Sequence, residues 1–220
     1  IIINDFLKFS FKNKKKYPFL SDQNIIFIAG STGSGKSTLI KKLMENLNNF
    51  SEIPERRFIT LKGIVEPYAD YFNLKSDFST RENRIDIVQN YKKNIPEGIV
   101  FFLKGVQVTK DIPQGFIFDG IRGDEELKNV LKTFNKAKII VLNASKETRL
   151  KRINERKDPY DQVYKSNNYI AKDIINNDIK LHGNIKNHVS EKLIYINTDE
   201  LNPNEVFLTA YNWILDEKRI

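Results

Sequence analysis

The sequence predicts an α/β protein, a three-layer sandwich in which helices cover both faces of a mostly parallel five-stranded sheet. Three observations favour this class. The segment from Gly30 to Ser37, GSTGSGKS, has the G-x-x-x-x-G-K-S spacing of a phosphate-binding loop, or P-loop. Apolar runs of strand length alternate along the chain with helical patterns, which is typical of parallel sheets. The chain has 220 residues, 40% of them hydrophobic, enough for one substantial core.

The first half of the chain gives the elements around this loop. The apolar run 25–29 predicts the first strand, and residues 37–47 follow as a helix with one apolar face. Residues 58–61 are a candidate second strand. Residues 79–82, Ser-Thr-Arg-Glu, form a capping box that predicts the start of another helix. The apolar run 99–108 is ambiguous between helix and strand.

The second half of the chain repeats the alternation of strands and helices. Asp124, Ser145 and Asn202 are the expected N-caps of three of its helices. The predicted strands are 116–119, 138–142 and 193–196, and the predicted helices are 124–134, 145–156, 169–178 and 203–216. Ligands of such sheets lie outside the carboxyl ends of the strands. The P-loop and the end of strand 116–119 both fall at such ends.

The P-loop predicts a site for nucleotide phosphates. Its glycines let the backbone curl tightly, where side chains would block the phosphates. Its N–H groups form an anion-binding nest at a helix N-terminus. Lys36 would reach the β- and γ-phosphates, and the Ser37 hydroxyl would bind Mg²⁺. The predicted nucleotide-binding residues are Gly30, Ser31, Thr32, Gly33, Ser34, Gly35, Lys36, Ser37 and Thr38.

A second motif begins at Asp119, which ends the apolar strand 116–119. Its carboxylate is the expected acidic partner of a P-loop and would organise Mg²⁺ directly or through water. Gly120 follows at the position where motor-type ATPases commonly place a glutamate that activates water. Arg122 comes next and could bind a second phosphate bidentately. The alternative is an exposed arginine paired with the acids of the following helix.

The segment Asp119-Gly-Ile-Arg122 resembles the D-G-x-(P)-R segment of nucleoside monophosphate kinases, without the proline. It is more similar to adenylate-kinase-like P-loop proteins that carry D-G-V-R, and the likeness extends weakly from about Ile25 to Trp213. The resemblance implies ATP- and Mg²⁺-dependent phosphoryl transfer, with Arg122 on the acceptor phosphate. Arg84 is a further predicted acceptor residue, because it lies on the helix that would flank the acceptor.

Three arginines, Arg149, Arg152 and Arg156, are spaced three and four apart and form one stripe along a helix. The stripe runs into residues 157–168 and resembles the lid of these kinases, whose arginines close over the phosphates and exclude water. The alternative is a solvated helix face with acidic partners. The predicted catalytic residues are Lys36, Asp119, Arg122, Arg152 and Arg156.

Composition and charge limit the classes of protein to which the sequence can belong. The net charge of +8 suits a nucleotide phosphate, a nucleic acid or an acidic surface as partner. There is no cysteine, which excludes disulfides and thiolate metal sites and fits a cytoplasmic location. No apolar run approaches the roughly 18 residues of a membrane span. We expect a basic N-terminal extension over residues 1–24 and one kinase-like domain over 25–220.

The leading functional hypothesis is phosphoryl transfer from ATP with Mg²⁺ to a small phosphorylated acceptor of the nucleotide class. One alternative is a kinase for a polynucleotide 5′-hydroxyl or another small-molecule hydroxyl, which the basic run between Lys12 and Lys16 favours. A second alternative is a nucleotide-binding regulatory module with little turnover. The sequence predicts neither the acceptor, nor a preference for ATP over GTP, nor the oligomeric state.

Overall fold

The structure of this protein is a computed structural model. The residues that it describes are 7–9, 17–54, 56–71, 73, 87–88, 91, 93–109, 113–121, 123–156 and 188–216.

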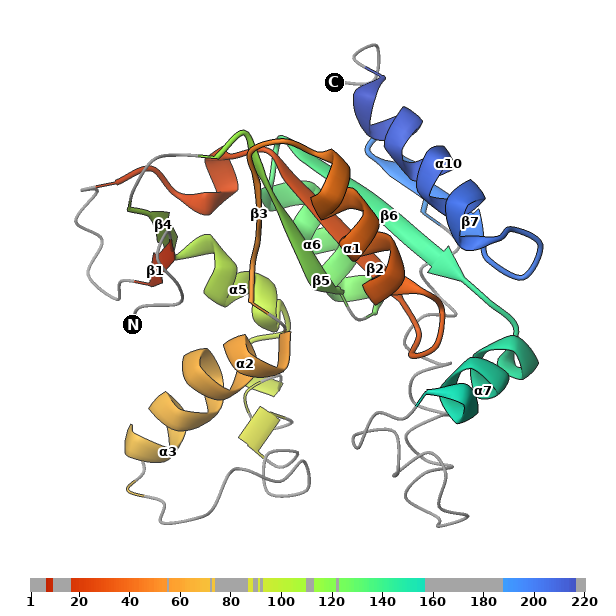
Figure 1. The fold of residues 1–220 in the computed structure, drawn as a ribbon. Helices are drawn as coiled ribbons and strands as arrows, with labels where there is room; N and C mark the ends of the chain where they lie inside the picture. The colour runs from red at the N-terminus through yellow and green to blue at the C-terminus, as the bar shows by residue number, and fades with distance from the viewer. Residues whose placement is uncertain are drawn as a thin grey trace.

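Five parallel strands form the main sheet (Figure 1). In chain order they are β2 (Ile25–Gly30), β3 (Phe50–Glu52), β5 (Gly115–Ile121), β6 (Ala137–Asn143) and β7 (Leu193–Asn197). Their order in space is β3-β5-β2-β6-β7, and each neighbouring pair is parallel. The central strand is therefore β2, which leads into the P-loop, with β5 and β6 directly beside it. The predicted fold class is confirmed.

The central strand β2 is apolar on both faces because the sheet is covered on both sides. Its side chains alternate: Ile25, Phe27 and Ala29 pack into one core cluster, and Ile26 and Ile28 pack into the other. All five are buried. This is the pattern of a parallel strand covered on two faces, where nearly every residue must be apolar. The continuous apolar run 25–29 in the sequence follows from this arrangement.

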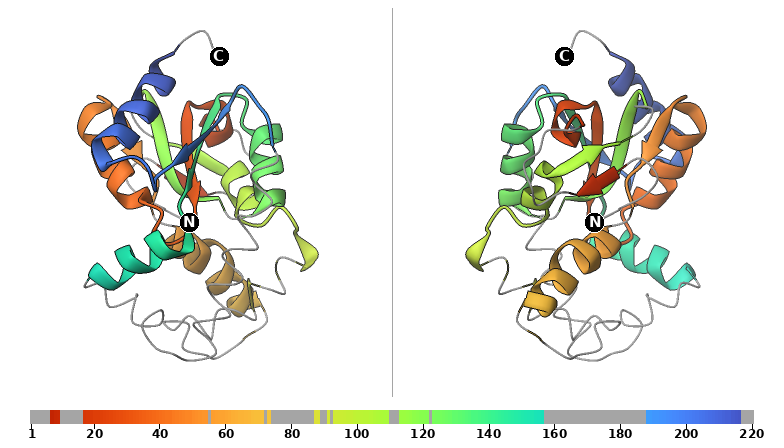
Figure 2. Two further views of the ribbon diagram at one scale, coloured as in Figure 1. Left: turned by 90° about the vertical axis from the view of Figure 1, so that its right-hand side faces the viewer. Right: turned by 90° about the vertical axis from the view of Figure 1, so that its left-hand side faces the viewer.

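Two pairs of helices cover the sheet (Figure 2). α1 (Lys36–Asn46) and α10 (Pro203–Leu215) pack on one face. α5 (Ile99–Lys104) and α6 (Asp124–Thr133) pack on the opposite face. Parallel strands require crossover connections, and helices in those connections bury the apolar faces that the strands leave open. None of the helices in the described ranges combines the length and hydrophobicity that crossing a membrane would require.

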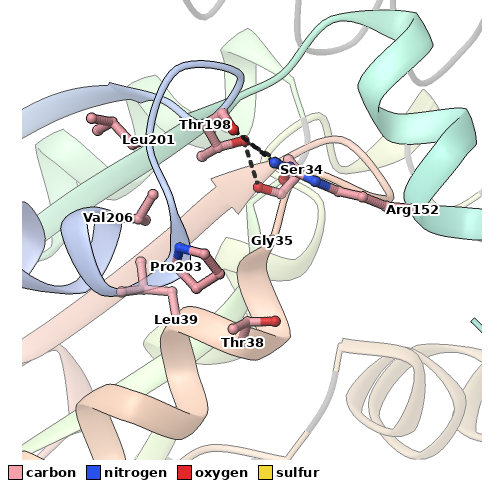
Figure 3. Close-up of a pocket in the computed structure, with 9 residues that line it drawn as sticks. All are labelled: Ser34, Gly35, Thr38, Leu39, Arg152, Thr198, Leu201, Pro203 and Val206. Atoms are coloured by element: carbon pink, nitrogen blue, oxygen red, sulfur yellow. Dashed lines mark hydrogen bonds between the residues drawn. The ribbon is translucent and has the colours of Figure 1, made fainter. Parts of the chain in front are cut away.

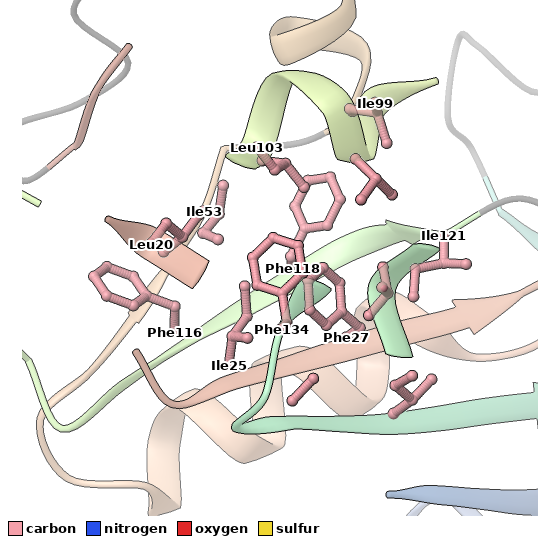
Figure 4. Close-up of a cluster of buried hydrophobic side chains, with 14 of the residues drawn as sticks. Leu20, Ile25, Phe27, Ile53, Ile99, Leu103, Phe116, Phe118, Ile121 and Phe134 are labelled. Atoms are coloured by element: carbon pink, nitrogen blue, oxygen red, sulfur yellow. The ribbon is translucent and has the colours of Figure 1, made fainter. Parts of the chain in front are cut away.

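Three phenylalanines fix the two strands that carry the predicted site residues (Figure 4). The ring of Phe27 on β2 lies edge-to-face with Phe118 on β5, at 6.0 Å between centroids, and with Phe134 after α6, at 5.1 Å. All three side chains are fully buried. Edge-to-face pairs add to the energy of burial and restrict how neighbouring strands sit. Phe118 directly precedes Asp119, so this contact holds the acid strand against the P-loop strand.

The N-terminal segment shares this core. β1 (Leu7–Phe9) pairs antiparallel with β4 (Val106–Val108), and a short 3-10 helix η1 (Leu20–Asp22) follows. Leu7 and Leu20 are fully buried in the core cluster on the α5 and α6 face. The expected extension over residues 1–24 therefore packs into the domain wherever it is described. The basic residues between 10 and 16 lie outside the described residues.

Several predicted helix ends are confirmed by their capping contacts. The Ser145 hydroxyl accepts a hydrogen bond from the Thr148 N–H at the start of α7 (Lys146–Glu155). Asn202 and Glu205 form a reciprocal capping box at the start of α10. Asp124 is the exception. It was expected to be the N-cap of α6, but Gly123 is the N-cap and Asp124 is the first helical residue.

The predicted second strand at 58–61 is wrong. These residues are helical, in α2 (Arg56–Thr60) and the π-helical turn η2 (Leu61–Val65), which continue into α3 (Glu66–Tyr71). The second strand of the sheet is β3 instead. The apolar residues of this region recur at helical spacing, and a four-residue run is too short to reveal that period. The ambiguous run 99–108 contains both elements, helix α5 followed by strand β4.

Three other predicted features lie outside the described residues. They are the capping box 79–82, the lid at 157–168 and the helix at 169–178. Residues 87, 88, 91, 93 and 94 are helical, within the segment expected to follow the capping box.

Candidate active site

The P-loop follows β2 and leads into α1, as the sequence predicted. Gly30 and Gly33 lie where the loop passes very close to other backbone. A Cβ atom at Gly30 would come within 2.5 Å of the Leu142 carbonyl oxygen, and one at Gly33 within 2.8 Å of the Arg149 carbonyl oxygen. Their φ angles are +143° and +85°. Side chains are excluded at both positions, so the loop packs tightly against β6 and α7.

The other end of the loop presents its backbone to open space. Gly35 is the N-cap of α1 in the left-handed conformation, and a Cβ atom there would meet nothing within 4 Å. Within the described residues no side chain caps this helix, so the N–H groups of its first turn are available to an anion. Lys36 begins α1, with its Nζ 3.4 Å from the Ser31 carbonyl oxygen across the loop. Ser37 and Thr38 are exposed in the first turn.

Asp119 lies beside the P-loop because β5 is the direct neighbour of β2. In the parallel register, Asp119 is paired with Ile28, two residues before the loop begins. Along β5, Ile117 packs on the α1 face and Phe118 on the opposite face. Since side chains alternate along a strand, the partly buried Asp119 is directed to the α1 face, where Ser37 lies in the first turn of the helix.

Ser37 and Asp119 fit a magnesium ion. A hydroxyl and a carboxylate oxygen are hard ligands, and protein-bound Mg²⁺ takes its remaining ligands from substrate phosphates and water. Among the described residues, no three His, Cys, Asp or Glu side chains gather into a cluster that could hold a metal. The residues present therefore fit a metal that is carried mainly by a bound nucleotide.

A hydrogen-bond network holds the outer side of the P-loop (Figure 3). Arg152 on α7 donates from Nη1 to the Gly33 carbonyl at 3.3 Å and to the Thr198 hydroxyl at 2.9 Å, and from Nη2 to the Thr198 carbonyl at 2.7 Å. The Thr198 hydroxyl in turn donates to the Ser34 carbonyl at 3.2 Å. The network joins the P-loop, α7 and the loop after β7 into one unit.

A pocket opens next to this network (Figure 3). Its apolar wall comes from α1, the loop after β7 and the start of α10, and its polar rim comes from the P-loop and the network. The lining residues are Ser34, Gly35, Thr38, Leu39, Arg152, Thr198, Leu201, Pro203 and Val206. An apolar pocket with a few convergent polar groups is the usual form of a small-molecule site. This one adjoins the nest where phosphates would bind.

Comparison with protein families identifies the chain. Residues 26–175, well over half of the sequence, match the model of an AAA domain family. The match includes the P-loop and Asp119. The chain belongs to this AAA domain family. The sequence-based identification of a P-loop protein is therefore confirmed.

Solved structures resemble this chain over most of its length. A sugar kinase from Janibacter sp. is 11% identical with a TM-score of 0.47, over 87% of this chain and 94% of that chain. A shikimate kinase from Bacteroides thetaiotaomicron is 15% identical with a TM-score of 0.47, over 87% and 98%. A shikimate kinase from Aquifex aeolicus is 18% identical with a TM-score of 0.43, over 86% and 95%. A search of curated protein sequences gives no match.

The three arginines of the predicted stripe do not share one environment in the AAA domain. Arg149 is only 6% exposed, with its main chain against Gly33. Arg152 is bound to Thr198, and Arg156 is exposed at the C-cap of α7. A fully solvated helix face is thereby excluded, because α7 packs directly on the P-loop. A lid role for Arg152 and Arg156 stays a prediction.

Two predicted acceptor residues, Arg122 and Arg84, lie outside the described residues. Their roles stay predictions. The neighbours of Arg122 in the sequence are described: β5 continues past the predicted strand 116–119 to Ile121, and Gly123 is the N-cap of α6 in place of Asp124.

Sequence reasoning missed Thr198 and the pairing of Arg56 with Glu126. Thr198 directly follows β7, so it lies at the carboxyl end of a parallel strand, where the ligand sites of such sheets gather. That rule could have found it. The Arg56–Glu126 contact joins residues 70 positions apart, and no local sequence pattern predicts it.

Proposed function

We propose that this AAA domain protein transfers the γ-phosphoryl group of ATP, with Mg²⁺, to a small phosphorylated acceptor of the nucleotide class. The observation that carries the proposal is the adjacency of two strand ends. The P-loop follows β2, and Asp119 lies near the carboxyl end of its direct neighbour β5, on the face that α1 covers. This juxtaposes a phosphate nest and a metal-organising carboxylate, the two parts that phosphoryl transfer requires on its donor side.

On the donor side, each residue has its own role in binding the nucleotide phosphates and the metal. The exposed N–H groups at Gly35 and the first turn of α1 bind the phosphates, and Lys36 neutralises their charge. Ser37 and Asp119 would hold the metal, which would supply charge stabilisation to the transferred phosphates. The side chain of Lys36 is within reach of this task, because it already bridges the loop to Ser31.

The pocket beside the P-loop suits the base of the donor. Its wall is formed by Leu39, Leu201, Pro203 and Val206, all apolar. Arg152 lies at its rim, with its guanidinium held in place by Thr198. A flat aromatic base would bury its faces against the apolar wall and stack near the guanidinium plane. The base and the triphosphate would then be bound by one continuous surface.

Transfer is favoured over hydrolysis by the geometry at Gly120. A Cβ atom there would come within 2.7 Å of the Phe118 ring and 2.9 Å of the Arg56 Cβ. No side chain fits at this position, so a carboxylate that activates water cannot follow Asp119 directly. A phosphate acceptor is itself an anionic nucleophile and needs no strong base.

On the acceptor side, Arg122 would bind the acceptor phosphate, Arg84 would flank it, and Arg156 would close over the transferred group with residues 157–168. These roles rest on the motif and its resemblance. They are supported by the position of β5, which brings Asp119, Gly120 and Ile121, the first three residues of this motif, to the same end of the sheet as the P-loop.

The test is a product assay over a panel of ribo- and deoxyribonucleoside monophosphates with ATP and Mg²⁺. We expect the wild type to phosphorylate at least one of them, and Lys36→Ala to lose about 10³-fold in kcat/KM, because the charge on the transferred phosphates is no longer neutralised. Lys41→Ala is the matched control, since Lys41 is exposed on the same helix. Intact turnover by Lys36→Ala would contradict the proposal.

The alternatives give different results in the same assay. A hydroxyl kinase, which the net charge of +8 favours, would phosphorylate a 5′-hydroxyl oligonucleotide, and its binding would fall steeply with salt. A regulatory module would bind ATP and give no phosphorylated product with any acceptor.

A further inference from the structure

Arg56 and Glu126 form a buried ion pair close to the end of β5. Arg56 begins α2, and Glu126 lies in the first turn of α6. Nη1 of the guanidinium donates to Glu126 Oε2 at 2.6 Å and Nη2 to Oε1 at 2.7 Å. The two side chains are 12% and 3% exposed. This is the bidentate arrangement in which the planes of guanidinium and carboxylate match.

The same guanidinium also donates to the carbonyl oxygen of Gly120. Gly120 directly follows Asp119 in the sequence. Arg56 therefore holds residues 120 and 126 at the same time, and the segment between them includes Arg122. Because both contacts come from one rigid planar group, they set the separation of the two ends of this segment.

Two glycines leave the space that the pair fills. A Cβ atom at Gly120 would lie 2.9 Å from the Arg56 Cβ, and one at Gly98 would lie 2.8 Å from Glu126 Oε1. A buried ion pair adds little stability over apolar side chains of the same size, because removing both charges from water is costly. What such a pair does provide is a directional contact, and here that contact is made to the strand that carries the acid.

Arg56 also begins a helical arm, defined as residues 56–71. The arm contains the π-helical turn η2, and such turns inside α-helices occur frequently at functional sites. Gly63 in η2 packs so closely on α5 that a Cβ atom there would come within 2.5 Å of the Phe102 ring. The arm is thus anchored at two points, and its first anchor is the residue that holds the end of β5.

We propose that Arg56 and Glu126 are positioning residues for the acceptor side of the reaction. They fix Gly120, the start of α6 and the base of the helical arm relative to Asp119, so that a bound acceptor phosphate is presented in line with the donor. Neither residue touches the reacting atoms. This inference rests on the proposed function.

The experiment separates positioning from folding. Arg56→Met and Glu126→Met each leave one buried charge unpaired, whereas the double variant Arg56→Met/Glu126→Met replaces the pair by apolar side chains of similar length. For each protein we would measure the melting temperature, the KM for ATP, and kcat and KM for the nucleoside monophosphate that the wild type phosphorylates fastest. The matched control is Lys62→Met/Glu66→Met, which removes an exposed ion pair of 2.7 Å from the same arm.

We expect the double variant to regain the melting temperature that the single variants lose, because the apolar pair leaves no buried charge. Its KM for ATP should stay within about twofold of wild type, while kcat/KM for the acceptor stays at least about tenfold lower. The control should match wild type in all three measurements. Glu126→Gln, which keeps the shape of the side chain, should also raise the acceptor KM and leave the ATP KM unchanged.

Either of two results would overturn this inference and leave the proposed function standing. In the first, acceptor kcat/KM recovers together with the melting temperature in the double variant. In the second, the ATP and acceptor constants of Glu126→Gln deteriorate equally. Either would show a structural role without positioning. A wild type that phosphorylates no member of the panel would instead remove the proposed function, and this inference with it.

Discussion

The proposed donor side and the proposed acceptor side of the site are held together by different kinds of contact. On the donor side, Arg152 and Thr198 bind mainly to backbone carbonyls of the P-loop and its neighbour. On the acceptor side, Arg56 and Glu126 form an ion pair that is almost fully buried. An unpaired buried charge costs more than the loss of one hydrogen bond from a charged donor to a neutral acceptor. Damage should therefore be gradual on the donor side and severe on the acceptor side.

The largest effect is expected for Glu126→Met, which leaves the Arg56 guanidinium buried without its carboxylate. The free energy of unfolding should fall by about 3–5 kcal/mol. Urea denaturation measures this, and the double variant Arg56→Met/Glu126→Met is the control that should restore most of the loss. A single variant within about 1 kcal/mol of wild type would remove the contrast between the two sides.

A smaller effect is expected at the glycines of the P-loop. Gly33 and Gly35 have similar positive φ angles of +85° and +98°, but only at Gly33 would a Cβ atom meet backbone, 2.8 Å from the Arg149 carbonyl oxygen. Gly35→Ala should cost about 1–2 kcal/mol of unfolding free energy, from the left-handed backbone alone. Gly33→Ala should cost about 1 kcal/mol more, because α7 must move. Equal losses in urea denaturation would show that α7 does not pack on the loop.

Thr198→Val should weaken nucleotide binding without abolishing it. The variant keeps the shape of the side chain but removes the hydroxyl that joins Arg152 to the Ser34 carbonyl. The lost hydrogen bond to the charged Arg152 guanidinium is worth about 1.5 kcal/mol or more, which is roughly tenfold in Kd. Titration calorimetry with a nonhydrolysable ATP analogue measures it. Thr198→Ser, which retains the hydroxyl, should bind like wild type, and a serine variant as weak as the valine variant would contradict the role given to this contact.

The smallest effect is expected for the pH dependence of stability that arises from Asp124 at the start of α6. Hydrogen bonds from Lys128 and then from His188 hold the pKa of Asp124 below its ordinary value. Because the pKa is lower in the folded state, the stabilisation is present above the unfolded pKa and is lost as pH falls through the folded pKa.

Asp124→Asn should therefore lower the unfolding free energy by about 0.2–1 kcal/mol at pH 7 and have no effect in strong acid, below the lowered pKa. Unfolding curves at both pH values measure this. Glu45→Gln, at an exposed site on α1, is the donor-side control. A loss for Asp124→Asn of equal size in strong acid would show that the charge is not its source.

The same division explains what the sequence could predict. The P-loop, strand 25–29 and the caps at Ser145 and Asn202 depend on residues within one turn or one strand of each other, so spacing alone reveals them. The sheet follows from the alternation of these elements. The acceptor side depends on contacts between distant segments. Arg56 and Glu126 are 70 residues apart, and neither position carries a motif.

The errors have the same physical origin. Residues 58–61 are helical because they continue the arm that Arg56 begins, and a strand-like apolar run of four residues cannot show this. The spacing of the three arginines correctly places Arg149 and Arg152 on one helix, and Arg156 is its C-cap. The spacing cannot tell that α7 packs on the P-loop, which buries Arg149 and binds Arg152 to Thr198. Periodicity identifies a face, but only the tertiary fold decides what covers it.

The most direct test of phosphoryl transfer is a product balance in the wild type, with ATP, Mg²⁺ and the preferred nucleoside monophosphate, quantified by ion-exchange chromatography. The account predicts that each ADP formed is matched by one phosphorylated acceptor with little free phosphate, because no side chain fits at Gly120 to activate water. ADP matched by inorganic phosphate, at a rate that is the same with and without acceptor, would contradict it.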